Sequence, residues 1–145
     1  MPEPVERISI CIDESVEMES VDTDRLRRLT EIVLERESVV WSSISIVLAG
    51  HETVRNLNRK YLDHDYETDV LSFLIDQTGD GIDAEVYVDV QTAVERHVEF
   101  KVSLRQEIER YLIHGLLHLA GYEDDKPRKK RRMQELEDQY LTAAY

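Results

Sequence analysis

The sequence predicts a fold with a single β-sheet and several helices, of the α+β or α/β kind. Segments with strand-like patterns alternate with segments of helical periodicity along most of the chain. Two helical segments then close the chain without a strand between them. The length of 145 residues and the hydrophobic fraction of 41% suit one domain, residues 1–145, with one core.

The predicted strands are short and apolar. Ile8, Ile10 and Ile12 alternate with other residues, which predicts a strand with one buried face. Cys11 lies in the same strand and is expected to be a small core residue. The continuous apolar run at 70–75 predicts a central strand. The predicted strands are 5–12, 43–49, 70–75 and 84–89, with a turn at 78–81.

The predicted helices carry apolar residues at intervals of three and four. In the helix at 90–100, this spacing places Val94 and Val98 on the inner face. The long helix that follows begins near Ser103, which can act as the N-cap, and Gln106 completes a capping box. The predicted helices are approximately 22–37, 51–62, 90–100, 103–120 and 126–143.

Composition excludes several classes of protein. A formal net charge of −13 and a pI near 4.7 argue against a general nucleic-acid binder. They do not exclude RNA binding if basic residues are concentrated in one part of the surface. A single cysteine, Cys11, allows no intramolecular disulfide and favours a reducing compartment. The sequence shows no signal peptide and no apolar run of membrane-spanning length. We therefore expect a soluble, cytoplasmic protein without a membrane partner.

The most informative segment is His114 to Asp124. His114 and His118 stand four residues apart, so on a helix they share one face with a rise of about 6 Å and can reach one ion. Gly121 can end this helix and turn the chain back, bringing Glu123 or Asp124 to the same ion. Two imidazoles, one carboxylate and an open position are typical of a catalytic metal site. Alternatively, both histidines are simply satisfied by packing, since their spacing alone is a weak signal.

Two segments resemble the signatures of one family. The first comprises 57–61, Asp65 and 68–73. The second is 114–122, and the corresponding family signature reads HGxLHLxGYDH. These segments resemble the YbeY family, the metal-dependent endoribonucleases of bacterial ribosome maturation. The resemblance implies an α+β fold: a single small mixed sheet of about four strands packed with about five helices, with the metal site at the end of a central buried helix.

The resemblance also implies a ligand set. Transferred residue by residue, the family's zinc ligands fall on His114, His118 and Asp124, and the last of these is a histidine in the family. A carboxylate oxygen can bind zinc, so this set is chemically sound for one Zn²⁺ ion. The harder oxygen ligand also permits Mn²⁺ or another divalent metal. Glu123 and Asp125 are neighbouring alternatives for the third ligand, but Glu123 occupies a position at which the family has an aspartate that does not bind the metal.

Other site residues follow from the first signature. Leu62 stands where the family has an arginine that serves the substrate phosphate. Arg59, one helical turn earlier, or Lys60 beside it can supply this catalytic charge in its place, although the motif assigns this role to neither. Asp69 and Ser72 fall near the family's site, where Asp69 can orient a ligand and Ser72 can hold substrate or a water molecule. Alternatively, both satisfy backbone groups at the start of a strand.

The function implied by the resemblance is single-strand-specific cleavage of RNA. Its implied roles are 3′-end processing of small-subunit rRNA and ribosome quality control, with the rRNA precursor and the ribosomal small subunit as partners and no DNA. The metal, held by His114 and the other two ligands, would lower the pKa of a bound water that attacks the phosphodiester. Leu62 and Asp124 favour an alternative function, a catalytically weakened family member that binds the ribosome or a protein. A metalloprotease is disfavoured because Gly115 occupies the position of the glutamate in HExxH.

A basic run follows the site. Lys126, Lys129 and Arg132 belong to it, and we expect these residues to bind RNA phosphate beside the metal. Alternatively, the run forms a solvated helix face that pairs with Glu135 and Glu137.

Overall fold

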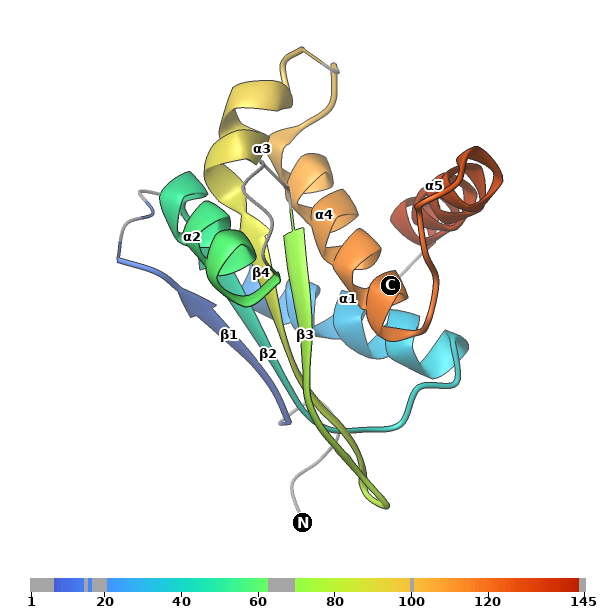
Figure 1. Ribbon diagram of the computed structural model, residues 1–145. Helices are drawn as coiled ribbons and strands as arrows, with labels where there is room; N and C mark the ends of the chain where they lie inside the picture. Colours follow the sequence, from blue (N-terminus) through green and yellow to red (C-terminus); the bar gives the residue numbers. More distant parts are fainter. Residues whose placement is uncertain (1–6, 15, 17–20, 63–69, 100, 144–145) are drawn as a thin grey trace.

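Four strands form one mixed sheet in the order β1-β2-β4-β3 (Figure 1). The parallel part comprises β1 (Ile8–Ile12), β2 (Trp41–Ala49) and β4 (Gly81–Asp89). The last strand, β3 (Val70–Thr78), pairs antiparallel with β4. The computed structural model describes residues 7–14, 16, 21–62, 70–99 and 101–143. With five helices in these ranges, the predicted α+β fold with a small mixed sheet is confirmed.

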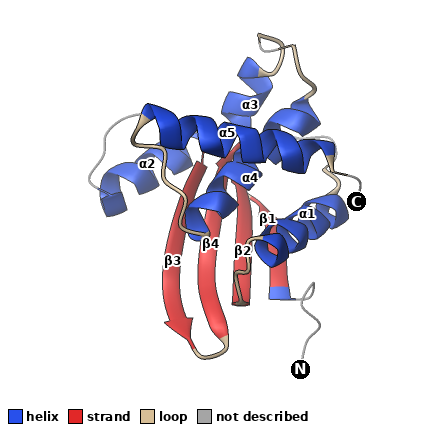
Figure 2. Cartoon of the chain, turned by 90° about the vertical axis from the view of Figure 1, so that its right-hand side faces the viewer, coloured by secondary structure: helices blue, strands red, loops and turns tan. Residues whose placement is uncertain are grey.

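The helices are arranged on both faces of the sheet. In Figure 1, α1 (Thr23–Arg36) and α4 (Leu104–Leu119) lie to the right of the sheet and α2 (His51–Leu62) to the left. The short α3 (Val90–Arg96) follows β4 directly. The last helix, α5 (Pro127–Thr142), packs on the outer side of α4, and Figure 2 shows it in front of α4. No helix within the described ranges is long and apolar enough to cross a membrane.

Two hydrophobic clusters hold these layers together, one on each face of the sheet. Alternate residues of β2, including Ile44 and Ile46, are fully buried in the larger cluster with the inner side of α4, including Leu112 and Leu116. The smaller cluster lies on the other face, and its buried residues are Ala49, Val54 and Leu71. The position of α4 between the sheet and α5 makes it the central buried helix that the sequence predicts.

Gly115 allows α4 to approach the sheet closely. A Cβ atom at this position would lie 2.8 Å from Val70 Cγ2 and 2.9 Å from Val86 Cγ1, closer than real contacts allow. The Ser72 hydroxyl donates a hydrogen bond of 2.7 Å to the Gly115 carbonyl oxygen, which further ties α4 to β3. This close packing fixes the height of the helix on the sheet, and with it the positions of the histidines on either side of Gly115.

Two expectations about the strands are wrong. The run at 70–75 is not a central strand: β3 is an edge strand, and Leu74 and Ile75 are 54% and 56% exposed where the β3–β4 hairpin extends beyond the helices. Cys11 is exposed rather than buried, because it faces the side of β1 opposite to Ile8, where the smaller cluster includes no described residue of β1. Of the isoleucines of this strand, Ile8 is buried and Ile12 is exposed.

The helix at 90–100 is also shorter than predicted, and its inner face differs. It ends at Arg96, and Val94 and Val98 are exposed. Val90 and Ala93 are buried instead, because the helix starts directly at the end of β4 and that connection fixes its rotation. The capping box of α4 is confirmed, with the predicted partners, Ser103 and Gln106.

Candidate metal centre

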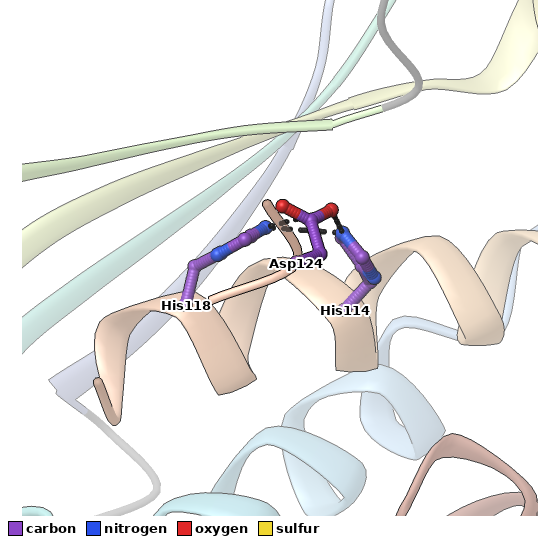
Figure 3. Close-up of side chains that lie close together, drawn as sticks. All are labelled: His114, His118 and Asp124. Atoms are coloured by element: carbon purple, nitrogen blue, oxygen red, sulfur yellow. Dashed lines mark hydrogen bonds and ion pairs between the residues drawn. The ribbon is translucent and has the colours of Figure 1, made fainter. Parts of the chain in front are cut away.

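Three ligand-bearing side chains converge at the end of α4 (Figure 3). The Nε2 atoms of His114 and His118 are 3.0 Å apart. Asp124 Oδ2 lies 3.2 Å from His114 Nε2 and 3.8 Å from His118 Nε2. One ligand atom from each residue therefore falls within 4.8 Å of the others, a group that can hold one metal ion. The carboxylate comes from the loop after α4, and all three side chains are partly exposed.

The loop geometry that brings Asp124 back depends on Gly121. This residue has a φ of +104°, a conformation that favours glycine. The Gly121 amide donates to the His118 carbonyl at 3.1 Å and the Tyr122 amide to the Leu117 carbonyl at 3.0 Å, which is the Schellman pattern of helix termination. The predicted end of the helix is thereby confirmed, and the turn directs the following residues over the histidines.

The same turn orients His118. The Tyr122 carbonyl oxygen lies 3.0 Å from His118 Nδ1. Because a carbonyl oxygen can only accept, Nδ1 carries the hydrogen and Nε2 is left with a lone pair. Nε2 is the atom that faces His114 and Asp124, so the ring presents its free donor atom to the site.

A carboxylate from α5 orients His114 in the corresponding way. Glu137 is only 4% exposed, and its Oε2 lies 2.7 Å from His114 Nδ1. Its Oε1 accepts a hydrogen bond of 3.1 Å from Arg110, whose other terminal nitrogen donates to Asp138 at 2.6 Å. The alternative in which Glu137 pairs with the basic run is therefore wrong. Glu137 lies four residues after Met133 and three before Tyr140, both buried, and this inward position is the sequence signal that was missed.

The two histidines have opposite pKa shifts. Burial lowers the pKa of His114, but the hydrogen bond and charge of Glu137, together with Asp124, outweigh burial and raise it above the ordinary value. Burial and the neighbouring charge on His114 lower the pKa of His118. These opposite shifts favour a proton on His114 over one on His118, and Nε2–H of a protonated His114 can donate to the lone pair of His118. A cation bound to both Nε2 atoms would take the place of this proton.

Comparison with known proteins identifies the family. A family model described as Endoribonuclease YbeY matches residues 11–145. The chain belongs to the YbeY family. It is 45% identical to Endoribonuclease YbeY of Salinibacter ruber over 98% of this chain and 92% of that protein, and 34% identical to the protein of the same name in Chloroherpeton thalassium over 95% and 96%. The solution structure of TM1509 from Thermotoga maritima is similar with a TM-score of 0.57 and 27% identity, over 92% of this chain and 86% of that one.

Among the described residues, none of those predicted from the first YbeY signature belongs to this ligand group. Arg59 is on α2, which packs on the opposite face of the sheet from α4, and its guanidinium donates to Asn56 at 2.7 Å. Leu62 is the last residue of α2, and Asp69 lies outside the described residues. Ser72 reaches the site through the helix backbone, since it bonds to the carbonyl of Gly115 between the two histidines.

The basic run begins on α5. Lys129 Nζ lies 2.8 Å from Glu123 and 3.4 Å from Asp125, and Arg132 lies 3.6 Å from Glu135. Lys126 is exposed at the N-cap of the helix. Lys129 contacts Glu123 at the surface, whereas Asp124 is the carboxylate that lies beside the histidines.

Proposed function

We propose that this chain, with residues 1–145 acting as a single domain, is a metal-dependent endoribonuclease that cleaves single-stranded RNA. The observation that carries the proposal is the convergence of His114, His118 and Asp124, in a chain whose relatives are named endoribonucleases. We further propose the small-subunit rRNA precursor as substrate, 3′-end processing and ribosome quality control as the roles, the ribosomal small subunit as partner and the cytoplasm as location.

The donor set fits zinc. Two imidazole nitrogens and one carboxylate oxygen are ligands that zinc accepts, and three protein ligands leave one position for water or substrate. The oxygen ligand Asp124 also suits Mn²⁺. When bound, such an ion supplies a water of lowered pKa and polarises a phosphoryl oxygen. We therefore propose one Zn²⁺ ion, with Mn²⁺ as the substitute.

The residues around the ligands support this role. Glu137 and the Tyr122 carbonyl fix both rings through their Nδ1 atoms, so that each Nε2 faces the site before any ion binds. Paired carboxylates such as Glu137 also make an imidazole ligand more basic. The site is partly exposed, which leaves room for a large substrate to approach.

The test is cleavage of a single-stranded RNA and of the same sequence in a duplex, with added zinc or manganese. We expect the wild type to cut only the single strand, and His114→Ala and Asp124→Ala to lose most of this activity. Asp125→Ala is the matched control, since Asp125 contacts Lys129 rather than the histidines. Equal rates for the wild type and His114→Ala would overturn the proposal.

Leu62 supports a second candidate function, because it stands where the family has its phosphate-binding arginine. In that case the chain is a catalytically weakened member of the family that binds the ribosome or a protein. Stoichiometric metal and RNA binding without cleavage in the same experiment would favour this second function.

A further inference from the structure

A hollow of about 190 Å³ lies beside His114, between α4 and α5. Helix α4 lines it with Arg110, Tyr111 and His114. Helix α5 lines it with Lys130, Gln134 and Glu137. One wall of the hollow is therefore part of the candidate metal centre, and an RNA strand bound at the metal would pass close to it.

Lys130 is directed into this hollow by helical periodicity. It precedes Gln134 by four residues and Glu137 by seven, so all three lie on the face of α5 that is turned toward α4. Lys129 and Arg131 are each rotated by about 100° around the helix axis from Lys130. Of the basic run, Lys130 is the residue that lines the hollow beside His114.

The charge of Lys130 is also not neutralised locally. Lys129 is occupied by Glu123 and Asp125, and Arg132 by Glu135. Arg110, the other cation of the hollow, is bound by Glu137 and Asp138. Among the contacts of the described residues, the Lys130 side chain has no hydrogen bond or ion pair.

We propose that Lys130 binds the RNA phosphate adjacent to the metal centre, an inference that rests on the proposed function. A lysine ammonium is a compact cation with three donors on a flexible stem, which suits a phosphate oxygen in a hollow of this kind. It would supply on α5 a positive charge that the chain lacks at Leu62 on α2. The alternative is that Lys130 is merely solvated at the rim of a gap between two helices.

The test is equilibrium binding of a fluorescein-labelled single-stranded RNA to the zinc-loaded chain, by fluorescence anisotropy at several salt concentrations, with RNA integrity checked on a gel. We expect Lys130→Ala to weaken binding by about tenfold, the scale of one charge-assisted hydrogen bond. The slope of log affinity against log salt should fall by about 0.7, the value for one contact to single-stranded RNA. Lys130→Arg should retain most of the affinity, and zinc content should stay at the wild-type level in both variants.

The matched control is Arg131→Ala, which removes the same charge from the next position of α5, also exposed. Equal losses in Lys130→Ala and Arg131→Ala would overturn the inference, even if the wild type cleaves RNA. Lys130-dependent binding without any cleavage would support the inference and contradict the proposed nuclease function. Failure of the zinc-loaded wild type to bind RNA at all would overturn both.

Discussion

Two histidine–carboxylate pairs occupy different regions of this protein, and only one of them belongs to a candidate metal centre. His114 Nδ1 lies 2.7 Å from the buried Glu137, and His51 Nδ1 lies 2.9 Å from Asp89, which is fully buried. Both carboxylates therefore hold an imidazole through the same ring nitrogen. The regions differ at the opposite nitrogen, where His114 meets His118 and Asp124.

The pair at His51 joins the starts of two helices. Asp89 caps α3 by accepting from the amide and the hydroxyl of Thr92. The His51 amide, at the start of α2, donates to Gln91 Oε1 at 3.1 Å. No cluster of three metal-ligating side chains is found there among the described residues. In the His51 region, the histidine bound to a carboxylate thus connects the starts of two helices. In the His114 region, two further ligand-bearing side chains converge on the histidine.

The largest effect is expected from removing one imidazole in each region. His118→Ala should abolish stoichiometric zinc binding, because two remaining ligands hold an ion poorly. His51→Ala should keep one zinc per chain. The measurement is zinc content by atomic absorption after gel filtration, with thermal unfolding to confirm that both variants are folded. Equal loss of zinc in His51→Ala would contradict the distinction between the two regions.

A smaller effect is expected from Glu137→Gln, which keeps the shape of the side chain and removes its charge. Loss of the carboxylate behind a metal-binding histidine typically costs 10–100-fold in metal affinity. The control is Asp138→Asn, since Asp138 shares the contact with Arg110 but does not touch His114. Competition with a chromogenic zinc chelator measures both affinities. A Glu137→Gln affinity equal to that of Asp138→Asn would show that the Glu137 charge does not reach the site.

The sequence predicts that the three side chains of the candidate site converge, because their arrangement depends on local geometry. His114 and His118 are related by one helical turn, and the turn at Gly121 needs only a positive φ. Asp124 follows within three residues of that turn, so short-range geometry decides its position. The contacts that orient the rings differ in this respect, since His114 and Glu137 are 23 residues apart and meet only when α5 packs on α4.

The wrong predictions about the fold also concern features that depend on contacts between distant segments of the chain. The apolar residues of β3 predict burial but not strand order, which depends on how β3 pairs with β4 and places Leu74 and Ile75 at an edge. Cys11 fits the pattern of a core residue, yet its strand is the opposite edge. Periodicity therefore identifies the elements, whereas long-range pairing decides which of their residues are buried.

The smallest effect is expected in the pH dependence of the metal-free protein. The raised pKa of His114 means that its stabilising contribution is fully present below the ordinary value of about 6.5 and is lost as pH rises through the raised pKa. The lowered pKa of His118 acts in the opposite sense, and its contribution is lost as pH falls from about 6.5 through the lowered pKa. The contribution of these two histidines to the free energy of unfolding of the metal-free chain should therefore be largest at pH values between the two shifted pKa values. In that range His114 carries a proton and His118 does not.

Chemical denaturation at a series of pH values, in the presence of a chelator, measures this component. His114→Gln should flatten the decline on the alkaline side, because Gln cannot hold the proton. Because a bound cation would replace a proton on His114, zinc affinity of the wild type should rise with pH over the same range. Calorimetry in two buffers of different ionisation enthalpy would detect the released proton. Zinc binding without proton release at neutral pH would show that the two imidazoles do not share one.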